Sequence, residues 1–361
     1  MKIIIMHKTV AKFDAIGNDI ESMYKILNKR YDCQLFAEYP ENKSLSYISK
    51  SQLLAELNVP ENIYIYHHSL NWELGEDILK EIKGKIIFRY HNITPPGFFN
   101  PYDPYQGRLC SEGRKQTEYL VKNYKEAIWL SDSNYNAKDI QAVEKSRSYV
   151  CPPFHKIEQW ADAEDDIDVK KMLLENDTIH LLFVGRIVPN KGYIFLLDCL
   201  KTFIMSYHLN IKLNIIGKFN EGIAPYNEFL KAVIQEYGLQ DKIEFIGEIT
   251  DQILATYYRY SDLFLCGSEH EGFGVPLVEA QYFGLPIIAL NSSAVPETIG
   301  EKQVVLNKDA KKFAAAINII NENKEYYNYL AEKGKDKYNS CYSFELLKEK
   351  FEKIIEKCIN E

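Results

Sequence analysis

The chain has 361 residues, of which 46% are apolar and 26% charged, and its formal net charge is −8 at pH 7. This length and composition predict a folded protein of two domains, or three, and exclude a disordered chain. The acidic excess leaves no surplus of positive charge to displace the counterions of a nucleic acid, so we expect no nonspecific nucleic-acid binding.

The seven cysteines are scattered and form no Cys-x-x-Cys pair, which argues against a disulfide framework and against a zinc site. The N-terminus has a short apolar run without a signal-peptide pattern, and no apolar stretch approaches the ~18 residues of a membrane-spanning helix. We therefore expect a cytoplasmic protein with reduced cysteines. Peripheral contact with the inner face of a membrane stays open, although the charge balance does not favour it.

Strand and helix patterns alternate through the first half of the chain. Short apolar runs predict strands at 2–6, 33–36, 63–66, 85–90 and 127–130. Apolar residues at helical spacing predict helices at 20–30, 73–82 and 114–124. Such alternation is typical of a parallel, doubly wound sheet.

The second half repeats this architecture without an obvious sequence repeat. The first pattern breaks near 150–155, and the acidic stretch 161–168 is interpreted as a linker or an exposed helix start. Further apolar runs predict strands at 180–184, 213–216, 243–246, 263–266 and 286–290. The last segment, 343–360, has the spacing of an amphipathic helix. The predicted domains are therefore 1–160 and 161–340, with a terminal helix within 341–361.

Two glutamates, Glu271 and Glu279, flank a predicted helix start, with seven residues between them. Gly272 and Gly274 leave backbone N–H groups uncovered, and Pro276 suits a first helical turn. The N-terminus of a helix attracts phosphate groups. The segment therefore predicts a phosphate site flanked by two carboxylates that accept from hydroxyls, which suits a sugar joined to a nucleotide by a diphosphate.

Two cations follow a strand end in the same half. Arg186 and Lys191 lie between Gly185, which ends the strand, and a predicted helix start. Ligands bind beyond the carboxyl ends of the strands in such sheets, where arginine and lysine suit a diphosphate. Taken alone, the pair is more consistent with surface cations in a turn. Gly217 and Gly247 end the next two strands. The loops that follow them either hold a flat nucleobase by backbone contacts or only end the strands.

Together these motifs resemble the retaining glycosyltransferases of family 4. The resemblance covers residues 180–300 closely and the N-terminal half more loosely. The matching segments are Gly185-Arg186…Lys191-Gly192, Phe245-Ile-Gly247, Ser268-Glu-His-Glu271-Gly-Phe-Gly…Glu279-Ala…Gly284-Leu-Pro-Ile and Val295-Pro-Glu-Thr-Ile-Gly300. It implies an α/β protein of the GT-B fold, with two Rossmann-like doubly wound domains facing a central cleft and a C-terminal helix that crosses back to the first domain.

The resemblance also implies roles for individual residues. Arg186 and Lys191 would bind the donor diphosphate, Glu271 would hold hydroxyls of the donor sugar, and Glu279 those of the ribose. The backbone of Ile249 would meet the nucleobase. The residues expected to bind the nucleotide sugar are Gly17, Gly185, Arg186, Lys191, Gly217, Ile249, Glu271, Gly272, Phe273, Gly274, Val275, Leu277 and Glu279.

In the first domain, His91 follows the strand at 85–90 and resembles the family's active-site histidine, which lies against the transferred sugar. With Arg186, Lys191 and Glu271 it forms the expected catalytic set. His67 and His68 end the preceding strand and either line the acceptor cleft or are structural.

The loop at 14–19 would approach the diphosphate from the first domain. Many relatives have two adjacent glycines there, whereas this chain has Ile16-Gly17, which puts the closeness of that approach in question. Asn18 and Asp19 are read as helix caps or as acceptor contacts.

The expected reaction is retaining transfer of a hexose-type sugar from a UDP-sugar or GDP-mannose to a hydroxyl of a glycan or lipid-linked acceptor, in surface polysaccharide synthesis. We expect no cofactor and no essential metal, because Arg186, Lys191 and the helix dipole would stabilise the leaving diphosphate. The acidic cluster 165–168 is interpreted as solvated charge rather than a metal motif. A phosphorylase or sugar-nucleotide epimerase of the same fold, and a noncatalytic sugar-nucleotide-binding protein, stay open as alternatives.

Overall fold

The computed structural model describes residues 1–12, 14–175 and 177–360. By its internal contacts the chain divides into two units. The first unit comprises Met1–Pro96, Tyr105–His155 and Phe344–Glu361, and the second comprises Gly97–Pro104 and Lys156–Ser343. In the part of the chain that the structure describes, no helix has the length and apolar character needed to cross a membrane.

The first unit is built on a parallel sheet with the strand order β2-β1-β3-β4-β5-β6. Its strands are β1 Lys2–Val10, β2 Asp32–Pro40, β3 Ile63–His68, β4 Lys85–Tyr90, β5 Ile128–Ser131 and β6 Ser148–Val150. In the register of the sheet Ile3 pairs with Cys33 on one side and with Ile63 on the other. Every residue of β3 is buried, as expected for a strand covered on both faces.

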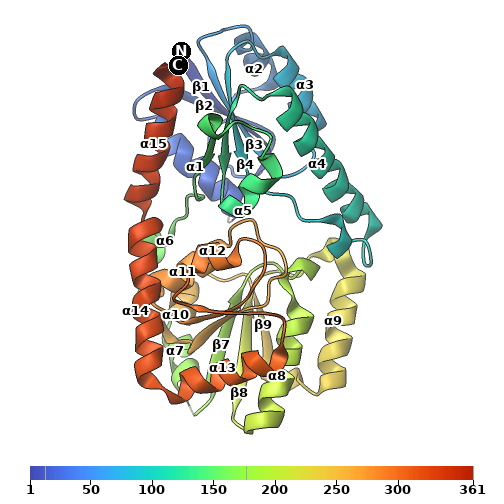
Figure 1. The fold of residues 1–361 in the computed structure, drawn as a ribbon, viewed down its shortest axis with the longest axis vertical. Coiled ribbons are helices and arrows are strands. Elements are labelled where there is room, and N and C mark those ends of the chain that lie inside the picture. The colour runs from blue at the N-terminus through green and yellow to red at the C-terminus, as the bar shows by residue number, and fades with distance from the viewer. Residues whose placement is uncertain (13, 176, 361) are drawn as a thin grey trace. The chain divides into compact units, whose positions relative to one another are not determined.

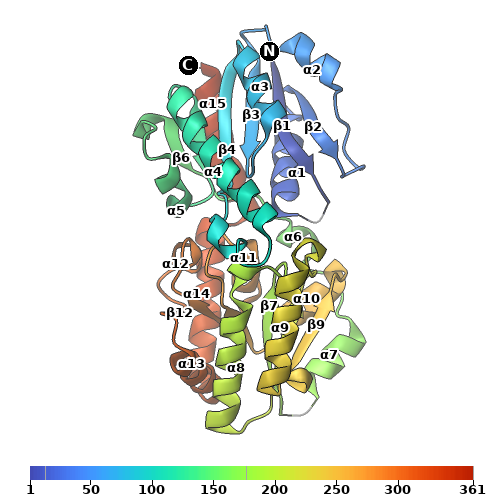
Figure 2. The ribbon, with the colours of Figure 1, turned by 90° about the vertical axis from the view of Figure 1, so that its right-hand side faces the viewer.

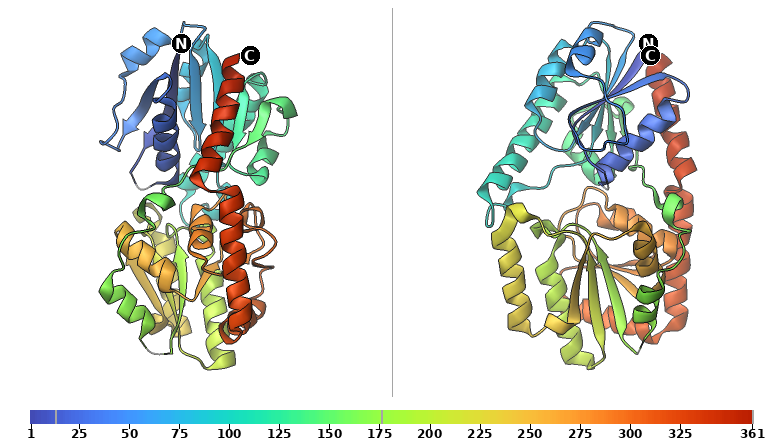
Figure 3. Two further views of the ribbon diagram at one scale, coloured as in Figure 1. Left: turned by 90° about the vertical axis from the view of Figure 1, so that its left-hand side faces the viewer. Right: turned by 180° about the vertical axis from the view of Figure 1, so that it is seen from behind.

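Helices cover both faces of this sheet (Figure 1). They are α1 Ala15–Leu27, α2 Lys50–Glu56, α3 Glu73–Glu81, α4 Pro104–Asn123, α5 Asn134–Ala137 and α15 Phe344–Asn360, with 3-10 turns at Lys138–Ile140 and Lys145–Arg147. A further 3-10 turn, Pro96–Phe98, contains residues of both units. Met23 of α1 and Phe351 of α15 belong to one apolar core, whereas Leu53 of α2 and Leu120 of α4 belong to the other. Figure 3 shows α15 running beside the strands of the first unit.

The second unit has a parallel sheet with the strand order β12-β11-β10-β7-β8-β9. Its strands are β7 Ile179–Val184, β8 Ile211–Ile216, β9 Ile243–Gly247, β10 Leu263–Cys266, β11 Ile287–Leu290 and β12 Val304–Leu306. In each unit the first strand, β1 or β7, lies inside the sheet with later strands on both sides. The strand order therefore reverses there, and ligands bind at that point in open α/β sheets.

The helices of the second unit include α8, which contacts α9 and α13 (Figure 2). The helices are α6 Ile157–Trp160, α7 Ile167–Leu174, α8 Tyr193–Tyr207, α9 Ala224–Tyr237, α10 Asp251–Tyr260, α11 Val275–Phe283, α12 Val295–Ile299, α13 Ala310–Glu322 and α14 Lys324–Cys341. Its 3-10 turns are η4 Pro189–Lys191, η5 Glu221–Ile223 and η6 Gln240–Lys242.

The elements differ from the sequence prediction mainly at their ends. The strands at 85–90 and 263–266 agree residue for residue, whereas β6 and β12, of three residues each, were missed because they are too short to show a period. The helix predicted at 20–30 begins at Ala15, because the Asp14 side chain caps it by accepting from Gly17 N–H.

The acidic stretch 161–168 does contain a helix start, because Asp166 caps α7 by accepting from Val169 N–H at 3.0 Å. Its interpretation as solvated charge is wrong for Asp165. That carboxylate accepts from Lys170 at 2.8 Å and from Tyr260 at 2.6 Å, and these bonds lower the pKa of Asp165 to about 2.

Candidate active site

The carboxyl ends of β7, β8 and β9 bring three glycines together in the second unit. Gly217 N–H donates to the Gly247 carbonyl at 3.0 Å, and Gly185 N–H donates to the Ile216 carbonyl at 2.9 Å. A Cβ added to Gly217 would lie 2.1 Å from the Gly185 carbonyl oxygen. Only glycine at position 217 permits this approach of the backbones, so Gly217 lies at the predicted edge of the sheet for a steric reason.

Arg186 and Lys191 differ in their exposure and in their side-chain contacts. Arg186 is exposed, and no other residue that the structure describes makes a hydrogen bond or ion pair with its guanidinium. Lys191 is in η4 with its side chain 18% exposed, and its Nζ lies 2.6 Å from Oε1 of Glu271. One cation is thus open to a ligand, while the other is held by the carboxylate expected to bind the sugar.

Backbone bonds fix the Lys191 loop against the Glu271 loop. The Asn190 carbonyl accepts from Glu269 N–H at 2.8 Å, and Asn190 Nδ2 donates to the His270 carbonyl at 3.0 Å. Gly192, which precedes α8, has φ +68°, and a Cβ there would lie 1.9 Å from the Gly267 carbonyl oxygen. The sequence between Gly185 and Gly192 is therefore folded tightly onto the turn that carries Glu271.

Glu271 is held on three sides. Its Oε1 accepts from Lys191 and from Ser268 Oγ at 2.8 Å, and its N–H donates to Ser293 Oγ at 2.7 Å. Ser293 has φ +45°, a conformation that non-glycine residues rarely adopt and that clusters at functional sites. Among the described residues Glu271 Oε2 has no hydrogen-bond partner, so this oxygen is left for a ligand.

The start of α11 offers free backbone donors next to Glu271. Gly274 precedes the helix with φ +93°, and the N–H groups of Phe273, Gly274 and Val275 bond to none of the residues that the structure describes. Leu277 N–H already donates to the Gly274 carbonyl at 3.0 Å, so Leu277 contributes packing here rather than an open amide. Consecutive open N–H groups at a helix N-terminus suit an anion.

Glu279 lies inside α11, five residues into the helix, and makes a contact that the sequence did not predict. Its Oε2 accepts from the Tyr258 hydroxyl of α10 at 2.6 Å. Burial raises the pKa of the Glu279 carboxyl to about 7, against the lowering effect of that hydrogen bond. Ile249, the residue expected to meet the base, is half-buried just before Thr250, which caps α10. The same helix carries Tyr258, the hydrogen-bond partner of Glu279.

In the first unit, His91 follows β4 and both its ring nitrogens are occupied. Its Nδ1 lies 3.1 Å from Oδ2 of Asp132, and its Nε2 lies 2.8 Å from Nδ1 of His67. Asn92, with φ +68°, turns the chain directly after it. The side chain of His91 is 4% exposed.

Arg89 organises the charges around His91, which the sequence did not reveal. Its fully buried guanidinium is ion-paired to Asp19, at 2.8 Å, and to Asp132, at 2.9 Å. Burial lowers the pKa of Arg89, but the two carboxylates outweigh it and raise that pKa above its ordinary value. Asp19 also accepts from Phe154 N–H at 2.7 Å and is not a helix cap.

Gly17 lies in the first turn of α1 rather than in the loop before it. A Cβ there would lie 2.1 Å from the Ala11 carbonyl oxygen, so close packing of the helix on the preceding loop accounts for the glycine. Its N–H is directed to Asp14 Oδ2 at 3.4 Å.

Among the described residues, three groups come close enough to suggest a metal site: Asp19, His67 and His91, whose ligand atoms lie within 4.8 Å of one another. Two histidine nitrogens on a tetrahedral metal would lie roughly 3.4 Å apart, given bonds of about 2.1 Å. The observed 2.8 Å between His67 and His91 is a hydrogen bond, and Asp19 is bound to the Arg89 guanidinium. The arrangement therefore suits a hydrogen-bond network better than a cation.

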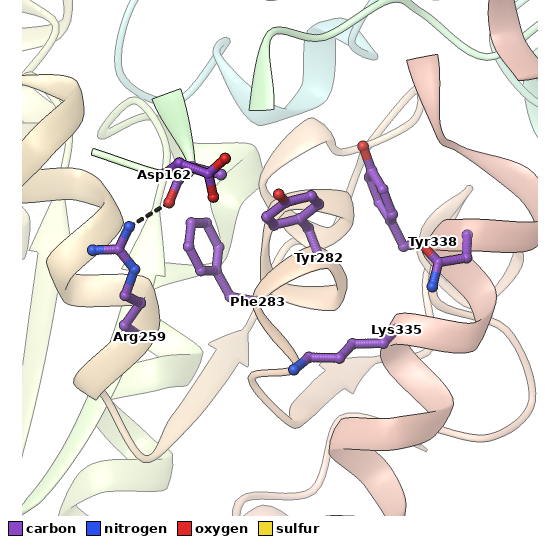
Figure 4. Close-up of a pocket in the computed structure, with 8 residues that line it drawn as sticks. Asp162, Arg259, Tyr282, Phe283, Lys335 and Tyr338 are labelled. Carbon is purple, nitrogen blue, oxygen red and sulfur yellow. Dashed lines mark hydrogen bonds between the residues drawn. The ribbon is translucent and has the colours of Figure 1, made fainter. Parts of the chain in front are cut away.

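A hollow of about 440 Å³ lies at the C-terminal end of α11 (Figure 4). It is lined by Ala161, Asp162, Arg259, Tyr282, Phe283, Lys335, Tyr338 and Asn339, none of which belongs to the predicted site. The Arg259 guanidinium is already committed, because it donates to the Ala161 carbonyl and to Asp165. The predicted site residues Gly274, Val275 and Leu277 lie instead at the N-terminal end of α11.

Comparison with known proteins agrees with this organisation. Residues 164–337 match the family described as Glycosyl transferases group 1. Anabaena HepE, solved in complex with UDP and glucose, has a TM-score of 0.74 to this chain at 15% identity, with 99% of each chain covered. The fold is thus the GT-B fold, as predicted, with two doubly wound units and a terminal helix in the core of the first. Within the second unit, residues 164–337 are thus similar to the glycosyl transferases group 1 family.

Two curated relatives match parts of the chain. An uncharacterized 41.2 kDa protein in the cps region of Klebsiella pneumoniae is 29% identical over 224 residues, which is 58% of this chain and 55% of the relative. The capsular polysaccharide biosynthesis glycosyltransferase CapH of Staphylococcus aureus is 26% identical over 151 residues, 41% of each. The chain therefore spans about half the length of these relatives.

Proposed function

We propose that the protein is a retaining glycosyltransferase that moves a hexose-type sugar from a UDP-sugar or GDP-mannose to a hydroxyl of a glycan or lipid-linked acceptor. The observation that carries the proposal is the grouping of open and charged donors in the second unit. Lys191 lies 2.6 Å from Glu271, and among the described residues Arg186 and the N–H groups of residues 273–275 have no partner. The similarity of residues 164–337 to a glycosyltransferase family supports the same reaction.

The donor diphosphate is assigned to the start of α11, between the two cations. Arg186 and Lys191 would bind its oxygens while the helix dipole and the open N–H groups offset the charge that grows on the leaving group. Glu271 Oε2 is left for sugar hydroxyls, and Glu279 with Tyr258 for the ribose. No step in this scheme requires a metal ion or a cofactor.

Same-face attack is preferred over a covalent intermediate. A double displacement needs a carboxylate nucleophile at the anomeric carbon. Glu271 Oε1 accepts from both Lys191 and Ser268, and these bonds lower its nucleophilicity and fix it as a hydroxyl acceptor. The donor phosphate oxygen would then take the acceptor proton.

The acceptor is assigned to the first unit, where His91 would lie against the transferred sugar. The similarity to CapH, a capsular polysaccharide biosynthesis glycosyltransferase, supports synthesis of a surface polysaccharide. We place the reaction in the cytoplasm, with a peripheral membrane contact if the acceptor is lipid-linked.

A panel of UDP- and GDP-sugars in a thermal-shift assay, with EDTA present, tests the proposal. One donor should raise the melting temperature, because it binds only the folded state, and should be hydrolysed slowly without an acceptor.

Glu271→Gln should lower turnover without accumulating a glycosyl-enzyme. A trapped sugar adduct in the mass spectrum contradicts same-face attack, and a panel without any stabilising donor contradicts the assignment as a whole. Stabilisation without turnover favours a noncatalytic sugar-nucleotide-binding protein, and phosphate-dependent release of sugar favours a phosphorylase.

A further inference from the structure

Four histidines of the first unit, His7, His67, His68 and His91, lie on or directly after β1, β3 and β4. Burial lowers the pKa of His7 and of His68 to about 3 and that of His67 well below its ordinary value. These three rings are therefore neutral at pH 7, and each carries one ring proton whose place the hydrogen bonds determine.

The bonds fix the tautomers of two of them directly. His7 Nδ1 lies 2.7 Å from the Thr9 carbonyl, which only accepts, so His7 carries its proton on Nδ1. Thr117 donates its hydroxyl proton to the Gly113 carbonyl, so it accepts from His68 Nε2 at 2.8 Å. The network around His68 is thus separate from that around His91.

His67 joins the His91 network. The Asp132 carboxylate accepts from Nδ1 of His91, so a neutral His91 presents a bare Nε2 to Nδ1 of His67. His67 then donates from Nδ1 and leaves its own Nε2 bare, and that atom is buried without a partner among the described residues. With a cationic His91 the proton of His67 would instead lie on this partnerless Nε2, and a buried unpaired N–H is the rarer and costlier defect.

We propose that His67 is a positioning residue for sugar transfer, which holds the neutral imidazole of His91 in one tautomer and one orientation between itself and Asp132. The inference rests on the proposed function, because it takes His91 to lie against the transferred sugar. Both ring nitrogens of His91 are then used inside the first unit, and the ring meets the sugar through its edge or face. Asp19 and Arg89 provide the charges that face this pair, with Asp19 Oδ2 3.9 Å from His91 Nε2.

The substitutions follow from the geometry. Asn in place of His67 puts an amide donor near the position of Nδ1, whereas Leu fills a similar space without a donor. His68→Gln is the matched control, because His68 is also buried in β3 but bonds to Thr117 outside the network. We expect His67→Leu to lower kcat by roughly tenfold, as loss of one orienting hydrogen bond does, with little change in the donor KM. His67→Asn should stay within about threefold of the native kcat, and His68→Gln should match it.

Nitrogen NMR of protein labelled at histidine reads the tautomers without any substrate. His67 should show a protonated Nδ1, the minority form of a free imidazole, and His91 should lose its single tautomer in His67→Leu but not in His67→Asn. A protonated Nε2 on His67, or equal losses of kcat in the Leu and Asn variants, would overturn the proposal. Displacement of both signals by added zinc would overturn it in favour of a metal site at Asp19, His67 and His91. If the native protein transfers no sugar, the proposed function fails, while the NMR result still decides the tautomer.

Discussion

At the scale of single residues, Glu279 makes the second unit sensitive to pH. Its folded-state pKa of about 7 exceeds the ordinary value near 4.5, so the folded protein binds this proton more tightly than the unfolded chain. The stabilisation is complete below pH 4.5 and is lost as pH rises through 7. Between pH 5 and 7 the free energy of unfolding of the native protein should therefore fall, relative to that of Glu279→Gln, by up to about 1 kcal/mol per pH unit. Denaturant unfolding of both proteins across this range gives the slopes, and parallel slopes would count against the buried carboxyl.

Substitutions of Arg186 and Lys191 should have similar effects on donor binding but different effects on the free energy of unfolding. Arg186→Ala removes an exposed side chain that has no partner in the part of the chain that the structure describes, so the free energy of unfolding should change by less than about 0.5 kcal/mol. Lys191→Ala breaks the contact with Glu271 and should lower it by about 2 kcal/mol. Both variants should weaken donor binding, and calorimetry with thermal unfolding measures the two effects independently. A large stability loss in Arg186→Ala would show that this side chain has a structural partner.

The sequence predicted the helix start within the motif that holds Glu271 and Glu279, and α11 does begin there, at Val275. Both glutamates lie within nine consecutive positions, so local helix chemistry was enough for this, and their role in binding stays a prediction. Arg89 could not be recognised, because its partners Asp19 and Asp132 are 70 and 43 positions away along the chain. Tyr258 was missed for the same reason, since its bond to Glu279 requires α10 to lie beside α11.

At the scale of elements, the turn before α8 depends on a glycine for space as well as for conformation. Gly192 and Gly238 both have φ +68°, but a Cβ would lie 1.9 Å from a carbonyl oxygen at Gly192 and would meet nothing within 4 Å at Gly238. Gly192→Ala should therefore lower the free energy of unfolding by about 3 kcal/mol or more, and Gly238→Ala by about 1 kcal/mol. Urea denaturation of the two variants makes the comparison, and equal losses would mean that the backbone conformation alone matters.

The elements were predicted best where the apolar run and the strand have the same bounds, as in β4 and β10. The fully buried β3 extends two residues beyond its predicted end, through His67 and His68. The starts of α1 and α4 depend on chemistry outside the periodic segment. α4 begins at Pro104, ten residues before the predicted helix at 114, because glycines and polar residues in its first turns hide the apolar spacing.

At the scale of the whole molecule, the terminal helix ties the end of the chain to the first unit. Phe351 is fully buried in α15 and packs edge-on against Phe154, with ring centroids 5.6 Å apart. Phe351→Ala should lower the free energy of unfolding by about 3–5 kcal/mol. Leu346, 40% exposed in the same helix, provides the control, since Leu346→Ala should change it by less than about 0.5 kcal/mol. Limited proteolysis should cut the first unit faster in the Phe351 variant; equal cutting rates would argue that α15 does not stabilise that unit.

The central claim is that the second unit binds a nucleotide sugar through Arg186, Lys191 and the start of α11 without a metal ion. Titration calorimetry of the native protein and of Arg186→Ala with UDP- and GDP-sugars, in EDTA, tests it most directly, with Arg108→Ala as a control for loss of an exposed arginine on α4. The account predicts that at least one donor binds, that Arg186→Ala weakens it at least about tenfold, and that the control does not. Equal affinity of the native protein and Arg186→Ala, or binding only after a divalent cation is added, would contradict it.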